Sequence, residues 1–299
     1  MTSRSFDLAI LALGVVAVST AAVLIREADA PSIIIAAYRL VLASLPLLLL
    51  AGVRRQRVLP ATQSVLLLTL LSGVCLAAHF GLWVAAVKQT SIVTSVVLVT
   101  TTPLFVGLAG GPLLGEKPGR TIWLALAIAG AGTLLMVSED FDAGGETLTG
   151  DAFALLAAIF ASGYLMAGRK LLGTGAGWLP YITVTYSTGA ALLLVAALVS
   201  GDALGGYSNR TFAFFVLLAL VPQLVGHTAV NRSLGHLPAI VVSLAVLGEP
   251  VGATILAAVF LDEDPTLLQL AGGLLVLAGV ATGVRGNVET RPSQAPEPI

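Results

Sequence analysis

Charged side chains are scarce in this sequence. They make up 10% of its 299 residues, whereas an ordinary soluble domain carries about 25%. A chain of this length would form roughly two soluble domains, but the charged residues needed to cover two such surfaces are missing. Apolar residues make up 57% of the chain, and its mean hydropathy is +0.98. This composition suits a lipid bilayer and excludes a water-soluble enzyme.

Other features are also missing. Cys75 is the only cysteine, so the chain can form no internal disulfide and no cysteine-based zinc site. The 15 basic and 16 acidic residues nearly cancel, which gives no general attraction for nucleic acid. The lysines are followed by Gln, Pro and Leu, so there is no G-x-x-x-x-G-K-[ST] phosphate loop, and ATP-driven pumping by this chain is excluded. We expect no cofactor and no nucleic-acid partner.

Apolar runs long enough to cross a membrane fill most of the chain. Short breaks rich in charge, Pro and Gly separate them, where a helix can end without leaving unpaired backbone groups in hydrocarbon. The first run is too long for the core of a cleaved signal peptide, so we expect it to be retained. We place ten spans at about 8–25, 31–52, 64–87, 92–114, 120–138, 151–169, 178–199, 211–231, 238–261 and 266–284.

The distribution of lysine and arginine predicts the orientation. With a cytoplasmic N-terminus, eleven of the 15 basic residues would be cytoplasmic, three would lie outside, and Arg39 would lie within a span. The loop 139–150 would lie outside, and it has four acidic residues and no basic one. We therefore expect both termini in the cytoplasm. The eleven are Arg4, Arg54, Arg55, Arg57, Lys117, Arg120, Arg169, Lys170, Arg232, Arg285 and Arg291.

The two halves of the chain resemble each other. When Pro103 is placed over Pro250, the sequence 113–118 (LLGEKP) lies over 260–265 (FLDEDP) without gaps. Five spans precede the acidic loop and five follow it, so the second half must enter the membrane from the opposite side. We predict an all-α polytopic membrane protein with ten transmembrane helices in two inverted five-helix repeats. The repeats would occupy 1–138 and 151–285, joined by an extracytoplasmic linker at 139–150 and followed by a disordered cytoplasmic tail at 286–299.

Several motifs resemble a known family. The stretches 86–91 (AVKQTS), 102–105 (TPLF), 113–116 (LLGE), 247–251 (LGEPV) and 260–263 (FLDE) are similar to the EamA module of the drug/metabolite transporter superfamily. Arg39, within Ala-Tyr-Arg-Leu, also suits the second span of such proteins. The resemblance covers about 7–284, and within the superfamily it is greatest to YddG-type exporters of aromatic and other amino acids. It implies a carrier of the bacterial inner membrane.

Polar side chains inside the spans indicate where the chemistry lies, because a charged group near the midplane costs roughly 2.5–3.5 kcal/mol. His79 and Trp83 share one face of the third span, and Gln223, His227 and Asn231 share one face of the eighth. At an offset of 148 residues, these two polar stripes superimpose position by position between the two halves of the chain. We expect them to border one cavity, with His79 and Trp83 nearer its outer end and Gln223 and His227 nearer its inner end. Hydrogen-bonded packing is the alternative.

The full set of predicted substrate-binding residues is Tyr38, His79, Trp83, Thr101, Tyr164, Gln223, His227, Asn231 and Ser243. Pro103 and Pro250 would kink the fourth and ninth spans, either to shape a cavity that changes during transport or as static bends. Arg39 and Glu249 are the full charges nearest the bilayer centre. Glu249 could couple transport to protons, contact a substrate ammonium, or pair with Arg39 for structural reasons.

These observations predict a secondary transporter that works by alternating access, not an enzyme, and the family resemblance implies that it exports amino acids, aromatic ones included, or similar small metabolites. Its partners would be a small-molecule substrate and the lipid bilayer, and one chain would suffice. A passive facilitator and a carrier for nucleotide-sugars or drug-like cations remain alternatives. Metal ligands are too few for a metal carrier, and an intramembrane enzyme would need a catalytic cluster that the spans do not contain.

Overall fold

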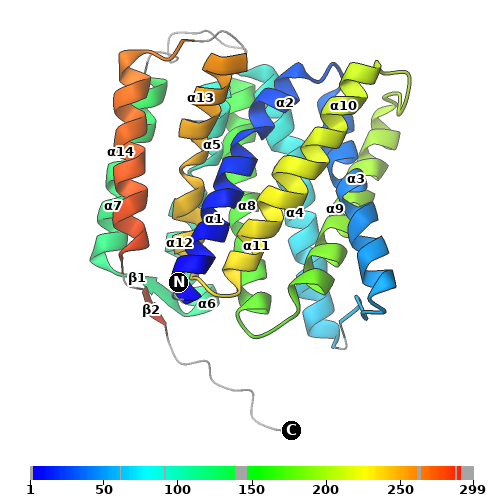
Figure 1. Cartoon of the computed structure of the whole chain (residues 1–299), viewed down its shortest axis with the longest axis horizontal. Helices are drawn as coiled ribbons and strands as arrows, with labels where there is room; N and C mark the ends of the chain where they lie inside the picture. The colour runs from blue at the N-terminus through cyan, green and yellow to red at the C-terminus, as the bar shows by residue number, and fades with distance from the viewer. Residues whose placement is uncertain are drawn as a thin grey trace, which may run out of the picture.

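Long apolar helices stand side by side in the computed structural model of the chain (Figure 1). The structure describes residues 3–60, 62–90, 92–138, 147–260, 264–286 and 288–290. Within these ranges, nine segments are long and apolar enough to cross a membrane, and Arg120–Met136 is a shorter apolar helix. The chain is therefore an all-helical polytopic membrane protein, as predicted.

The first half of the chain contains α1 (Ser3–Ser19), α2 (Ala21–Glu27), α3 (Ser32–Val53), α4 (Gln63–Gln89), α5 (Ile92–Val99), α6 (Thr102–Leu114), β1 (Glu116–Pro118) and α7 (Arg120–Val137). The second half contains α8 (Thr147–Leu172), α9 (Trp178–Ser200), α10 (Asn209–Leu218), η2 (Ala219–His227), α11 (Thr228–Leu234), α12 (Ala239–Val246), α13 (Glu249–Phe260), α14 (Leu267–Val284) and β2 (Val288–Thr290).

Two spans are divided near their middles at corresponding places in the two halves. The helix ends at Val99 and resumes at Thr102 in one, and it ends at Val246 and resumes at Glu249 in the other. Pro103 and Pro250 are each the second residue of the new helix, where the missing N–H of proline costs little. The Thr102 hydroxyl donates to the Val99 carbonyl at 2.8 Å, which satisfies one of the backbone groups freed by the break.

The span 209–234 contains a π-helical segment, η2, between two α-helices. Pro222 lies within this segment. π-Helical turns inside α-helices are frequently found at functional sites. The segment supplies Gln223 and His227.

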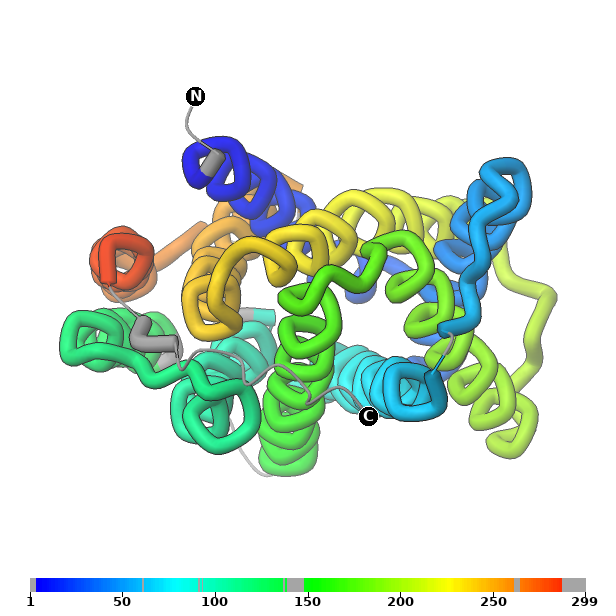
Figure 2. The backbone as a smooth tube through the Cα atoms, turned by 90° about the horizontal axis from the view of Figure 1, so that it is seen from below, coloured from blue at the N-terminus to red at the C-terminus, as the bar shows by residue number. Residues whose placement is uncertain are grey.

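Close backbone contacts join α7 to α14, which run together along one edge of the bundle (Figures 1 and 2). A Cβ atom built on Gly132 would lie 2.5 Å from the carbonyl oxygen of Gly272, and the reverse distance is also 2.5 Å. Small residues allow this approach in a membrane, where helix association depends on packing and not on the hydrophobic effect.

The beginning of α1 and the end of α14 lie at the same end of the bundle (Figure 1). The Arg4 guanidinium donates to the Val284 carbonyl there, at 2.9 Å. Next to it, β1 pairs antiparallel with β2. The structure thus differs from the disordered tail expected at 286–299, because residues 288–290 form a strand. The rest of that tail beyond residue 290, and most of the acidic linker (139–146), lie outside the described residues.

At the same end, polar contacts connect the two halves in what we call the β1-end cluster. The Glu116 carboxylate accepts from Arg169 Nε at 2.5 Å and from the backbone N–H of Ala239 at 2.9 Å. Arg169 also donates to the Leu234 carbonyl, at 2.9 Å. β1 is thereby tied to α8 and to the start of α12.

The opposite end has its own set of contacts. Arg26, in the last turn of α2, donates to the Thr90 carbonyl at 2.7 Å. Lys88 donates to the Ala28 carbonyl at 2.6 Å, and an exposed ion pair joins Arg210 to Glu27. These contacts fix the α2–α3 connection against the ends of α4 and α10.

Candidate functional site: a central cavity between the halves

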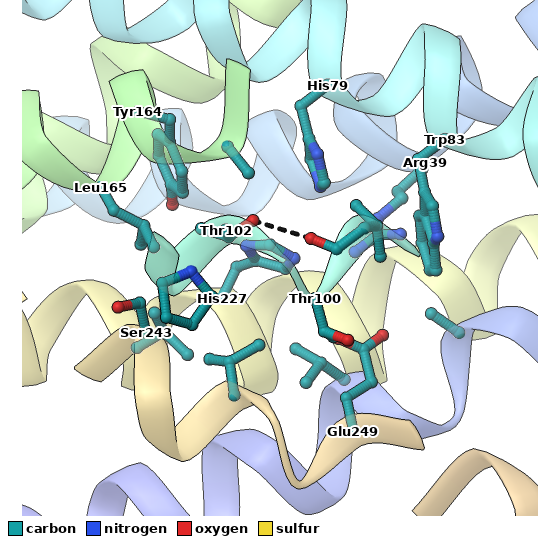
Figure 3. Close-up of a pocket in the computed structure, with 17 residues that line it drawn as sticks. Arg39, His79, Trp83, Thr100, Thr102, Tyr164, Leu165, His227, Ser243 and Glu249 are labelled. Atoms are coloured by element: carbon teal, nitrogen blue, oxygen red, sulfur yellow. Dashed lines mark hydrogen bonds between the residues drawn. The ribbon is translucent and has the colours of Figure 1, made fainter. Parts of the chain in front are cut away.

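A cavity of about 60 Å³ lies inside the bundle, between helices from both halves (Figure 3). Its wall is mostly apolar and carries a few polar groups, as small-molecule sites do. A dry apolar cavity of about 150 Å³ is large enough to bind benzene, so in this state the cavity is too small for an aromatic substrate. The polar lining side chains are Arg39, His79, Thr100, Thr102, Tyr164, His227, Ser243 and Glu249, and Trp83 adds its indole.

The divided spans place backbone and side chains at the cavity. Thr100, Thr102 and Pro103 come from the break between α5 and α6, and Ser243 and Glu249 flank the break between α12 and α13. Helices α3, α4 and α8 supply further lining residues, η2 supplies His227, and α1, α2 and α11 each add one apolar residue. Helix breaks at membrane depth are tolerated where they line a cavity, as these do.

Arg39 is fully buried and held from two sides. Its Nε donates to Gln223 Oε1 at 2.9 Å, and its guanidinium carbon lies 3.9 Å from the centre of the Phe80 ring. The two terminal nitrogens have no hydrogen-bond partner among the residues that the structure describes. A buried guanidinium with two unpaired donors is costly, so this arrangement is unusual for a purely structural arginine.

Glu249 is buried in the first turn of α13, where the helix dipole favours an acidic group. It lies on the opposite wall from Arg39 (Figure 3). Within the described ranges, no ion pair joins the two side chains. The cavity is therefore lined by one guanidinium group and one carboxyl group that do not form an ion pair with each other in the described structure.

Aromatic rings form the wall between the charges and the far end of the cavity. The His79 ring stacks on Trp83 with centroids 6.1 Å apart, and the centroids of His79 and His227 are 6.4 Å apart. His79 Nδ1 lies 3.0 Å from the Ala157 carbonyl, so this nitrogen must carry the proton that it donates. Trp83 Nε1 and His227 Nδ1 have no partner in the described part of the chain.

The structure brings together only part of the predicted substrate site. His79, Trp83, Tyr164, His227 and Ser243 line the cavity, as do the charges Arg39 and Glu249 and the proline Pro103.

Two other predicted residues lie behind the cavity wall. Gln223 anchors Arg39. Asn231 donates to the Tyr164 hydroxyl and, at 2.7 Å, to the His227 carbonyl. Both support residues that face the cavity.

The remaining predicted residues lie elsewhere. Tyr38 stacks on Phe215 and donates to the Leu204 carbonyl at 2.6 Å. The Thr101 hydroxyl donates to the Leu98 carbonyl at 2.8 Å. Pro250 is buried in α13 and is not among the lining residues.

Sequence reasoning missed Phe80, Thr100 and Thr102. The Phe80 ring packs against the Arg39 guanidinium group, but an apolar residue beside His79 gives no signal in an apolar span. Thr100 and Thr102 flank the predicted Thr101, and their place in the cavity depends on where the helix breaks. Pro222, inside the eighth span, is the sequence feature that could have predicted the π-helical segment there.

Comparison with known proteins identifies a family that covers almost the whole chain. The model of the EamA-like transporter family matches residues 6–138 and again residues 148–284. A solved crystal structure superimposes with a TM-score of 0.79, and the match covers 94% of this chain and 98% of the chain in that structure. The two sequences are 17% identical, so the match shows the fold alone.

Among curated relatives, the uncharacterized transporter YdfC of Bacillus subtilis is 29% identical over 82% of this chain and 79% of its own. The pseudopaline exporter CntI of Pseudomonas aeruginosa is 27% identical over 85% of this chain and 87% of its own. A probable terminal-alkyne amino-acid exporter of Streptantibioticus cattleyicolor is 29% identical over 81% of this chain and 80% of its own.

Proposed function

Because this chain belongs to the EamA-like transporter family, we propose that it is a secondary transporter that exports amino acids, aromatic ones included, or similarly small metabolites. Membership of the family, within the drug/metabolite transporter superfamily, makes the chain a transporter and not an enzyme. It is a multi-pass protein of the bacterial inner membrane. The protein lies in the lipid bilayer, and its substrate is a small molecule.

The observation that carries the proposal is the central cavity, where helix breaks from both halves meet the Arg39 guanidinium group and the Glu249 carboxyl group. In transporters, divided helices of this kind place the substrate site near the midplane. The small volume of the cavity corresponds to a closed state, and movement of the two halves relative to each other would widen it. Two relatives are named as exporters, one of them for an amino acid.

The proposed architecture has ten spans in two inverted five-helix repeats, 1–138 and 151–285. Two pairs of corresponding features support it. The helix breaks before Pro103 and Pro250 correspond. Arg26 and Arg169 also correspond: each lies at the end of the first span of its half and donates to a backbone carbonyl at the end of the third. α2 and α8 end at opposite ends of the bundle (Figure 1), as inversion requires.

We further propose that both termini are cytoplasmic and that one chain forms the complete site. The distribution of basic residues supports the orientation. The cavity is lined by both halves of one chain, which removes the need for a second subunit. The β1-end cluster would then close the cytoplasmic side.

The proposal is tested by measuring the flux of each of the twenty standard amino acids, radiolabelled, into proteoliposomes, with and without a pH gradient. We expect saturable, protein-dependent flux of at least one of them above that of protein-free liposomes. Flux at the same rate with and without the pH gradient would identify a facilitator and exclude Glu249 as a proton-coupling group. Absence of flux for all twenty would refute amino-acid transport and favour another class of metabolite.

A further inference from the structure

The free end of Arg39 is the least satisfied polar group at the cavity. Its Nε donates to Gln223, and one face of its guanidinium group packs on the Phe80 ring. Its two terminal nitrogens are buried and unpaired among the described residues. The side chain is therefore fixed in position while the donors of its planar fork remain available.

A planar guanidinium fork matches a carboxylate, which can accept two parallel hydrogen bonds from it. Burial strengthens such a bond, since little water competes for the donors. The Glu249 carboxylate would be the obvious partner within the protein, but no ion pair joins the two in the described structure. The free donors thus fit an oxyanion that comes from outside the protein.

Glu249 presents the complementary requirement. Its buried carboxylate faces the cavity and, within the described ranges, has no cation in contact with it. A ligand that brought only a carboxylate would satisfy Arg39 and be repelled by Glu249. A ligand that carries both a carboxylate and an ammonium, a short distance apart, would satisfy both.

We propose that the cavity recognises its substrate as an α-amino-acid zwitterion, with the α-carboxylate on the Arg39 fork and the α-ammonium on Glu249. This inference rests on the proposed function and specifies how that site selects its substrates. Arg39 and Glu249 bind the substrate directly, and Gln223 and Phe80 are positioning residues.

The rest of the cavity fits this orientation. Arg39, Trp83 and Glu249 lie toward one end, whereas Tyr164 and Leu165 lie at the other (Figure 3). A zwitterion held at the charged end would extend its side chain between the histidine rings toward Tyr164. That region is lined largely by aromatic and apolar groups, so the protein would discriminate strongly at the backbone groups of the amino acid and weakly at its side chain.

The first test needs no mutation. For an amino acid that the wild-type protein transports, we would compare inhibition of its flux by the unlabelled amino acid, by its carboxamide and by its desamino acid. The carboxamide lacks the carboxylate charge, and the desamino acid lacks the ammonium. We expect each analogue to inhibit at least about tenfold more weakly, because each leaves one buried charge without its partner. Equal inhibition by either analogue would overturn the proposal.

The second test assigns the two groups to their residues. In Glu249→Gln, the desamino acid should inhibit as well as the parent amino acid does, while the carboxamide stays weak. The control, Glu27→Gln, makes the same substitution in an exposed ion pair and should keep the wild-type order. If Glu249 only stabilises Arg39 structurally, Glu249→Gln would weaken all three compounds together, and the assignment would be wrong.

The outcomes separate this inference from the proposed function. If no amino acid is transported, the proposed function fails and this inference fails with it. If amino acids are transported but the analogues inhibit equally well, only the zwitterion assignment fails. If Glu249→Gln does not fold, the comparison of analogues on the wild-type protein still decides.

Discussion

The β1-end cluster allows a quantitative test of how the two halves are held together. Glu116 accepts one bond from Arg169 and one from the backbone of Ala239. Replacing Glu116 by Gln removes the charge but keeps an oxygen that can accept from Ala239. A double-mutant cycle with Glu116→Gln and Arg169→Gln therefore isolates the coupling energy of the ion pair.

The expected size follows from the exposure of the two side chains. The exposed fractions are 5% for Glu116 and 19% for Arg169, so the pair is largely but not fully buried. Exposed ion pairs contribute about 0–1 kcal/mol, and breaking a buried pair costs about 3–5 kcal/mol. We therefore expect a coupling of about 2 kcal/mol, between these limits.

The assay is the free energy of unfolding in mixed micelles, measured by circular dichroism during titration with a denaturing detergent. The ion pair of Arg210 with Glu27 is the matched control, because its side chains are 73% and 29% exposed. Its cycle should give a coupling below about 1 kcal/mol. A coupling for Glu116 and Arg169 no larger than that of the control would refute the reasoning.

Two further predictions concern packing and positioning. Gly132→Ala should destabilise the protein by about 1–3 kcal/mol, because the new Cβ would lie 2.5 Å from the Gly272 carbonyl oxygen. The control Gly130→Ala should leave the free energy of unfolding in detergent unchanged, because nothing lies within 4 Å of its Cβ. Gln223→Met should weaken amino-acid inhibition of transport about tenfold or more without unfolding the protein, because Arg39 loses its Nε acceptor; unchanged inhibition would show that Gln223 does not position Arg39.

Much of the helix layout could be predicted from the sequence, because hydrocarbon requires long apolar runs with paired backbone groups. The third predicted span, 64–87, lies within α4 (Gln63–Gln89). The polar stripes also predicted part of the cavity wall, because helical spacing puts His79 and Trp83 on one face of their span. The structure places both at the cavity, together with His227.

Other parts of the site depend on tertiary structure that spacing does not encode. Tyr38 is the neighbour of Arg39 in the sequence, yet its ring stacks on Phe215 away from the cavity. Asn231 lies on the predicted face, but Tyr164 covers it. Helical periodicity gives the face of a residue but not the side chain that packs over it, so wall residues and supporting residues could not be told apart.

The central claim is that substrate occupies the cavity between the halves. The most direct measurement is thiol labelling of His79→Cys and His227→Cys, made singly in a Cys75→Ala background, with a small water-soluble reagent. Both should react, and a transported amino acid should slow both reactions. Leu274→Cys, on an exposed apolar face of α14, is the control and should stay unreactive in the bilayer. If neither His79→Cys nor His227→Cys reacts from either side of the membrane, the cavity is a dry packing seam and the account is contradicted.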